Sequence, residues 1–96
     1  MTRESALAKL AECRRAIDDI DARIVALLNE RTRAVEIIGQ VKQEFQMPVY
    51  EPKREDEVFR NVIENNHGPL PAESVKRIFE RVVDEMRTLQ KLRMQR

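Results

Sequence analysis

The sequence predicts an all-α protein with three helices per protomer, the first of them very long. Glycine occurs only twice, tryptophan is absent and aromatic residues make up 4% of the chain, which argues against a sheet protein. Apolar residues recur at spacings of three and four over long stretches, as expected of amphipathic helices. Prolines occur only within residues 48–52 and 69–71, so they divide the chain into three helical segments.

The first predicted helix begins near Thr2 to Ser5 and ends near Phe45 or Gln46. Within it, twelve residues occupy successive a and d positions of one heptad pattern. Gly39 is the only proline or glycine in this stretch. Eight of these positions are apolar and four are charged, which is unusual because a charge in an apolar seam must be paired or must face a polar ligand. The seam comprises Leu7, Leu10, Arg14, Ile17, Asp21, Ile24, Leu28, Arg31, Val35, Ile38, Lys42 and Phe45.

The length of this helix predicts an intertwined homodimer. A helix of about 40 residues is about 60 Å long, whereas a compact chain of this size has a radius of gyration of only about 12–13 Å. The helix must therefore extend beyond any monomeric core and expose its apolar seam to water. A second copy of the chain is the simplest partner that covers it.

The second and third helices are delimited by proline and glycine. Residues 47–52 form a connector, and Pro52 suits the first turn of the second helix, with Glu51 at its cap. That helix runs to about Asn65, where Gly68 is expected to act as a left-handed terminator. The third helix runs from Pro71 or Ala72 to about residue 92, ahead of a frayed basic tail. The residues expected to face inward are Val58, Phe59, Val62 and Ile63 in the second helix, and Val75, Ile78, Phe79, Val82, Val83, Met86, Leu89 and Gln90 in the third.

Composition narrows the classes of function. The 96 residues fit a single domain, and a net charge of +1 gives no reason to expect a nucleic-acid partner. No stretch is apolar enough to span a membrane. The lone Cys13 excludes an intrachain disulfide and a cysteine metal cluster, and it fits a reducing cytoplasm. No phosphate loop, metal-ligand spacing or catalytic set around His67 is present, so neither a metal nor a cofactor is expected.

The charged seam positions indicate a binding site. Three of the four charged residues in the seam are cations, Arg14, Arg31 and Lys42. Arginine binds carboxylates with two hydrogen bonds, so several cations in a dry pocket suggest a small dicarboxylate ligand. The same cations are also compatible with ordinary ion pairs at a helix interface. Further polar candidates near the same faces are Glu51, Arg54, Glu55 and Gln90.

The order and spacing of several short motifs resemble the all-helical chorismate mutases, over residues from about Leu10 to Gln90. The turn at residues 63–69 looks most like the mutase domains that are fused to some bacterial DAHP synthases. Each motif is weak alone, and the ordered set is specific. The motifs are Arg14-x-x-Ile17-x-x-Ile20-Asp21, Leu27-Leu28-Asn29-Glu30-Arg31, Gly39-x-x-Lys42, Pro48-Val49-x-Glu51-x-x-Arg54-Glu55 and the helix that carries Gln90.

The resemblance implies the Claisen rearrangement of chorismate to prephenate, a step in aromatic amino-acid biosynthesis. The family works by selecting a folded conformer of the substrate and stabilising charge on its ether oxygen, without covalent catalysis. By resemblance, Lys42 and Gln90 hydrogen-bond the ether oxygen as its bond breaks. Arg31 binds a substrate carboxylate within its own protomer, and Arg14 binds one in the site of the partner.

The resemblance also implies roles for residues around the rest of the pocket. Glu55 and the Glu51 region hold the ring hydroxyl, and Arg54 adds positive potential at the wall. Met86 stands where the best-studied branch of the family has a serine that helps to hold a carboxylate. Glu51 stands where that branch has aspartate.

Three alternatives remain open on sequence grounds. An isochorismate–pyruvate lyase shares the fold and the cationic pocket, and it differs in the position of the substrate hydroxyl. A regulatory domain that senses chorismate or prephenate for a DAHP synthase, fused or separate, would need little activity of its own. A dimeric coiled-coil adaptor would have no need for three cations in the seam.

Overall fold

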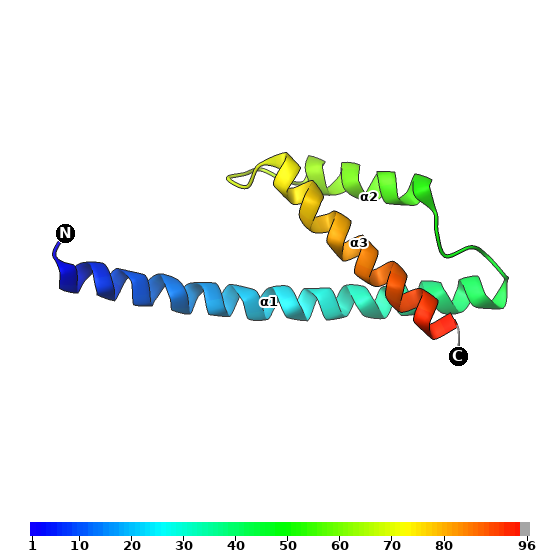
Figure 1. The fold of residues 1–96 in the computed structure, drawn as a ribbon, viewed down its shortest axis with the longest axis horizontal. Helices are drawn as coiled ribbons and strands as arrows, with labels where there is room; N and C mark the ends of the chain where they lie inside the picture. The colour runs from blue at the N-terminus through cyan, green and yellow to red at the C-terminus, as the bar shows by residue number, and fades with distance from the viewer. Residues whose placement is uncertain (95–96) are drawn as a thin grey trace. The chain divides into compact units, whose positions relative to one another are not determined.

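The computed structural model describes residues 1–94 and contains three helices and no strands over that range. The helices are α1 (Arg3–Glu44), α2 (Pro52–Glu64) and α3 (Ala72–Met94), and Figure 1 shows them in chain order. The chain divides into two compact units within α1. The N-terminal unit is Met1–Ala34, and the C-terminal unit begins at Val35 and contains the end of α1 with α2 and α3.

Helix α1 begins with a side-chain cap. The Oγ1 atom of Thr2 accepts a hydrogen bond of 3.1 Å from the backbone N–H of Ser5, and Glu4 lies in the first turn. An oxygen at this position satisfies one of the N–H groups that the first turn leaves unpaired, and a nearby carboxylate favours the positive end of the helix dipole. The capping residue is therefore Thr2, at the beginning of the range predicted for the start of this helix.

The N-terminal unit has an apolar face that is exposed among residues 1–94. All residues from 11 to 30 are exposed. The apolar seam positions of this unit retain 37–53% of their accessible surface, far more than a helix core would leave. They are Leu7, Leu10, Ile17, Ile24 and Leu28.

The C-terminal end of α1 is a Schellman motif built without glycine. Gln46 has a positive φ of 54°. The N–H of Met47 donates to the carbonyl of Lys42 at 2.7 Å, and the N–H of Gln46 donates to that of Gln43 at 3.3 Å. These are the two hydrogen bonds that define the motif. They end the helix at Glu44, just before the predicted boundary.

Helix α2 has the predicted bounds, but the residue that ends it differs from the prediction. Pro52 occupies the first turn, whereas Glu51 lies at the N-cap position without a side-chain capping bond. The helix ends at Glu64, where the N–H and side-chain amide of Asn65 both donate to the carbonyl of Asn61. Gly68 does have a positive φ, of 75°, yet it lies inside the following turn. Its predicted role as the terminator is therefore wrong, because asparagine bonds end the helix earlier.

Helix α3 packs on α2 and supplies the small core of the C-terminal unit. Within residues 1–94 the buried apolar side chains are Val75 and Val83, both on α3. The prediction that Ile63 and Ile78 face inward is wrong for this chain, since both are exposed. Half-buried residues complete the packing; they include Val58, Phe59, Val62, Phe79, Val82, Met86 and Leu89.

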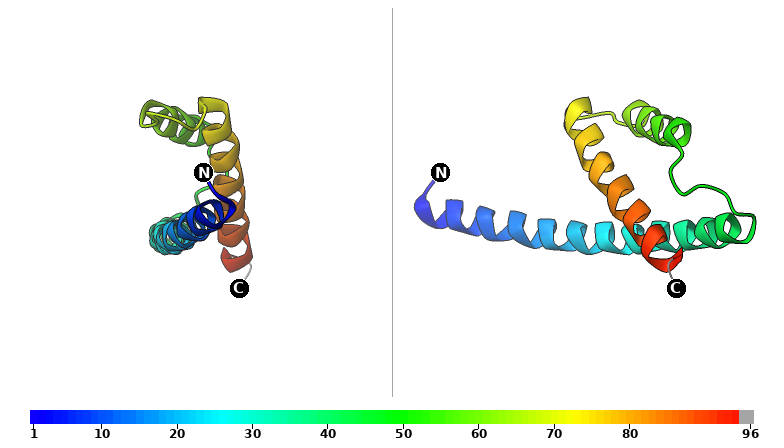
Figure 2. Two further views of the ribbon diagram at one scale, coloured as in Figure 1. Left: turned by 90° about the vertical axis from the view of Figure 1, so that its left-hand side faces the viewer. Right: turned by 45° about the vertical axis from the view of Figure 1, so that its right-hand side comes forward.

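The last turns of α3 lie beside residues 35–44 of α1, as Figure 2 shows. Two side-chain contacts join them: Gln90 bonds to Val35, and Arg93 pairs with Glu36. This end of the C-terminal unit therefore brings polar side chains of α1 and α3 together. Helix α3 continues to Met94, and the rest of the predicted basic tail lies outside the described residues.

Candidate functional site

Lys42 is a buried cation held by two oxygen atoms. Only 8% of its surface is accessible, although lysine is almost never buried unless it is paired. Its Nζ atom donates to the carbonyl of Val49 at 3.0 Å and lies 2.7 Å from Oε1 of Glu51. Both partners belong to the connector before α2, so the lysine ties the end of α1 to that connector. An ammonium group has three N–H donors, and one remains for another acceptor.

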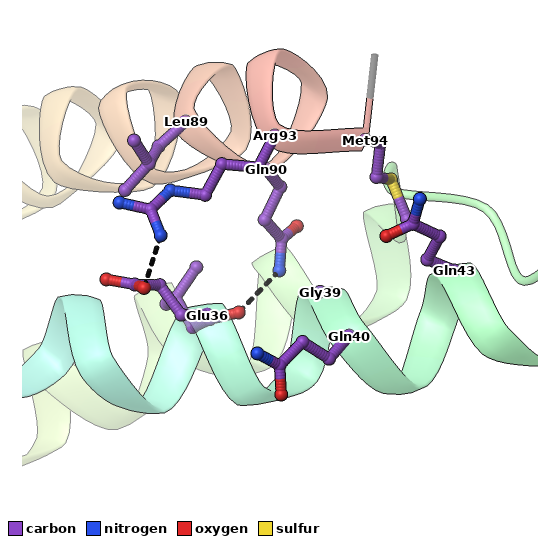
Figure 3. Close-up of a pocket in the computed structure, with 9 residues that line it drawn as sticks. Glu36, Gly39, Gln40, Gln43, Leu89, Gln90, Arg93 and Met94 are labelled. Carbon is purple, nitrogen blue, oxygen red and sulfur yellow. Dashed lines mark hydrogen bonds and ion pairs between the residues drawn. The ribbon is translucent and has the colours of Figure 1, made fainter. Parts of the chain in front are cut away.

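Gln90 is the second buried polar residue, with 9% of its surface accessible. Its Nε2 atom donates to the carbonyl of Val35 on α1 at 3.1 Å, and this bond is drawn in Figure 3. Gly39 faces the same side chain, and a Cβ atom added there would meet Gln90 Cγ at 3.6 Å. The single bond fixes the direction of the amide while leaving its second N–H and its oxygen for other partners.

Glu55 on α2 forms an ion pair with Arg87 on α3. The guanidinium donates to both carboxylate oxygens, with Nη2 at 2.6 Å from each and Nε at 3.1 Å from Oε2. The guanidinium also lies 4.9 Å from the centre of the Tyr50 ring, within the range of a cation–π interaction. The hydrogen bond to Glu55 raises the pKa of Arg87 above its ordinary value. The arginine therefore remains charged at any working pH.

A cavity of about 250 Å³ lies between the end of α1 and the end of α3. Figure 3 shows the residues around it, with the Arg93–Glu36 ion pair at one side. Its wall is rich in amides, and it contains one predicted site residue, Gln90. The lining residues are Val35, Glu36, Gly39, Gln40, Gln43, Leu89, Gln90, Arg93 and Met94.

The predicted site residues are distributed over both units. Arg14 and Arg31 belong to the N-terminal unit, where Arg14 is exposed and Arg31 is half-buried. In the C-terminal unit, Arg54 is exposed and lies 3.9 Å from Glu57 on its own helix. Met86 is half-buried on α3. The structure thus brings Lys42 together with Glu51, and it leaves Arg54 on the surface of α2.

Arg87 is the residue that the sequence analysis missed. It lies four residues after Val83 and three before Gln90, so it continues the buried stripe of α3. An arginine at such a position must find a carboxylate or face a ligand. That signal was present in the sequence, and Glu55, the partner of Arg87, had already been identified as a candidate site residue.

Within residues 1–94, no group of three histidine, cysteine, aspartate or glutamate side chains is arranged to hold a metal ion. No helix in the same range is both long and apolar enough to cross a membrane. Two buried donors remain: Lys42, which is paired with the carboxylate of Glu51, and Gln90, which bonds to the carbonyl of Val35. Buried donors of this kind can stabilise an oxygen atom that becomes negatively charged during a reaction.

Comparison with known proteins gives a consistent family match. The family described as chorismate mutase type II matches residues 13–91. A bifunctional chorismate mutase/prephenate dehydratase from Neisseria gonorrhoeae is 49% identical over 72 residues, which are 75% of this chain and 19% of that protein. A second bifunctional protein of the same name, from Aquifex aeolicus, is 33% identical over 86% of this chain and 24% of its own length. This chain therefore spans about a fifth to a quarter of these relatives.

Two further relatives have nearly the length of this chain. A chorismate mutase from Methanocaldococcus jannaschii is 29% identical and covers 86% of this chain and 85% of its own. The structure of a chorismate mutase from Thermus thermophilus matches with a TM-score of 0.84 and 31% identity, over 86% of this chain and 94% of the other. The bifunctional relatives carry a prephenate dehydratase, not the DAHP synthase that the turn at residues 63–69 had suggested.

Proposed function

We propose that this chain, which belongs to the chorismate mutase type II family, catalyses the rearrangement of chorismate to prephenate. One observation carries the proposal. Within residues 1–94, the buried polar side chains are Lys42 and Gln90, the same pair that the family resemblance assigns to the ether oxygen of the substrate. Burying a charge and an amide costs free energy, so a chain that buries these two groups has a use for them.

The rearrangement requires hydrogen-bond donors and a pocket that holds the substrate in its folded conformer, and it requires no covalent catalysis. As the rearrangement proceeds, the bond to the ether oxygen breaks while a carbon–carbon bond forms, and negative charge collects on that oxygen. The free N–H of Lys42 and the second N–H of Gln90 meet this charge. Both donors are already held in place by Val49, Glu51 and Val35, so little reorganisation is needed in the transition state.

The remaining polar residues bind the substrate. Arg31 takes one carboxylate within its own protomer. Glu55, with the Glu51 segment, accepts a hydrogen bond from the ring hydroxyl, and Arg54 contributes positive potential at the wall. Met86 adds no hydrogen-bond donor where the best-studied branch has a serine, so we expect substrate affinity to be weaker in this chain and the chemistry to be unchanged.

We further propose an intertwined homodimer in which Arg14 enters the site of the partner. The uncovered seam of the N-terminal unit supports this assembly, because five large apolar side chains in one heptad pattern remain in water in a single chain. Arg14 belongs to the same heptad pattern. A second copy would cover the seam and bring this cation to a carboxylate of the substrate.

The test is the loss of the ultraviolet absorbance of chorismate in the presence of the purified protein, with the Arg31→Ala variant measured beside it. We expect wild-type protein to yield prephenate and the variant to be severely impaired. A folded wild-type dimer that leaves chorismate unchanged would contradict the proposal. In that case the sensing function becomes the better explanation, and its test is a change in the activity of a DAHP synthase when the two proteins are mixed.

Product analysis separates the mutase from an isochorismate–pyruvate lyase. The match of the Glu51–Glu55 segment to the mutases favours chorismate over its isomer. We expect prephenate from chorismate, and no pyruvate from isochorismate. Rapid release of pyruvate from isochorismate, with chorismate left intact, would identify this protein as an isochorismate–pyruvate lyase.

A further inference from the structure

Arg87 joins three segments of the C-terminal unit. Its guanidinium binds both oxygens of Glu55 on α2, lies over the ring of Tyr50 in the connector, and is 3.6 Å from Asp84 on its own helix. The Arg87 and Glu55 side chains are 26% and 19% accessible, so water screens this pair less than it screens the surface pairs of the chain. A fork that donates to both oxygens allows the carboxylate one orientation only.

The carboxylate of Glu55 can accept a further hydrogen bond while it is paired with Arg87. An ionised carboxylate has about four lone-pair sites, and Arg87 forms three hydrogen bonds with it. A substrate hydroxyl can therefore donate to the carboxylate while the arginine stays bound. The direction from which it must approach is set by the plane of the guanidinium.

The contact with Tyr50 extends the effect of Arg87 to the connector. Tyr50 immediately precedes Glu51, and Glu51 is the residue that pairs with Lys42. The same arginine thus binds the carboxylate of Glu55 and contacts the residue that precedes Glu51.

We propose that Arg87 is a positioning residue that orients Glu55 to accept a hydrogen bond from the ring hydroxyl of the substrate, an inference that rests on the function proposed above. Arg87 touches Glu55 and not the reacting atoms. Its loss should weaken recognition of the hydroxyl and leave the donors at the ether oxygen in place. The effect should therefore be larger on KM than on kcat.

The experiment compares two substrates in wild-type protein and in the Arg87→Ala, Glu55→Ala and double variants. One substrate is chorismate, and the other is an analogue in which hydrogen replaces the ring hydroxyl. We expect Arg87→Ala to lower kcat/KM for chorismate by about 10- to 100-fold, the range expected for a hydrogen bond to a charged group. The loss with the analogue should be small, and the two mutations should be strongly non-additive.

Arg81→Ala is the matched control. Arg81 lies on the same helix and pairs with Glu85 at 2.8 Å, but both side chains are exposed, so its loss should leave both substrates unaffected. Arg87→Lys keeps the charge without the fork, and it should recover part of the discrimination against the analogue. Should Arg87→Ala fail to fold, as judged by circular dichroism, Arg87→Lys alone decides the test.

Two results overturn the inference, and they differ from failure of the proposed function. Equal losses with chorismate and the analogue would show that Arg87 stabilises the fold without guiding recognition of the hydroxyl. Unchanged discrimination in Arg87→Lys would show that the fork is not needed. By contrast, a folded wild-type protein that converts neither substrate would contradict the proposed function itself.

Discussion

The two units of the chain differ in what they bury, since every buried side chain among residues 1–94 lies in the C-terminal unit. The N-terminal unit keeps its apolar seam in water, with Ile17 and Ile24 each about half exposed. The C-terminal unit buries a lysine and a glutamine, and oxygen atoms of its own backbone and side chains accept hydrogen bonds from both. The proposed function accounts for this difference: the buried donors of the C-terminal unit would bind the substrate, and the apolar seam of the N-terminal unit would bind a second copy of the chain.

The largest expected effect concerns the buried lysine. Lys42→Ala removes a preorganised donor, so we expect kcat for chorismate to fall by about 10²- to 10³-fold. The helical content should survive, because the abandoned partner Glu51 is half exposed and can be hydrated. The measurement is initial-rate kinetics beside a circular dichroism spectrum, with Lys76→Ala on the surface of α3 as the control. Near-normal turnover in Lys42→Ala would contradict the proposal that Lys42 donates a hydrogen bond to the ether oxygen of the substrate.

The second effect concerns the apolar seam. Ile24→Asp places a charge where we expect two copies to meet, so the dimer should dissociate at concentrations that keep wild-type protein associated. Each buried isoleucine contributes about 1.5–3 kcal/mol, and the substitution acts twice per dimer. Light scattering after size exclusion measures the mass. Ala26→Asp, which lies outside the heptad seam, should leave the dimer intact; dissociation of both variants to the same extent would contradict the seam as the interface.

The third effect is small and concerns the end of α1. Gln46 holds a left-handed conformation that glycine adopts without steric cost, so Gln46→Gly should raise the free energy of unfolding by about 0.5–1 kcal/mol. Urea denaturation at a fixed protein concentration measures the change. Gln40→Gly inside α1 should instead lower stability by about 1 kcal/mol. A loss of stability in both variants would show that the Schellman motif does not exist in solution.

Helix positions were largely predictable from sequence, because they depend on local chemistry. Pro52 marked the start of α2, and the prolines at 69 and 71 marked the turn before α3. The ends of helices were harder to predict. Gln46 takes the left-handed position without glycine, and Gly68, which carries the glycine signal, lies past the end of α2. Helix α2 is ended by Asn65, whose backbone and side-chain N–H groups both donate to the carbonyl of Asn61.

The partners of the site residues were not predictable in the same way. The resemblance named Lys42 and Glu51 separately, and only the path of the connector shows that they form an ion pair. Glu55 was identified without Arg87, since the two are 32 residues apart and on different helices. The sequence pattern gave the faces of the helices, whereas the partner across a face depends on the packing of α2 on α3.

The most direct test of the account is complementation between Arg14→Ala and Lys42→Ala. Each variant alone should be nearly inactive toward chorismate. When the two variants are refolded together from urea in equal amounts, half of the dimers should contain one copy of each. Each mixed dimer then has one site in which both residues are intact. Activity should then recover to about a quarter of the wild-type value. If mixed dimers form and no activity returns, Arg14 does not act in the site of its partner, and the shared active site is contradicted.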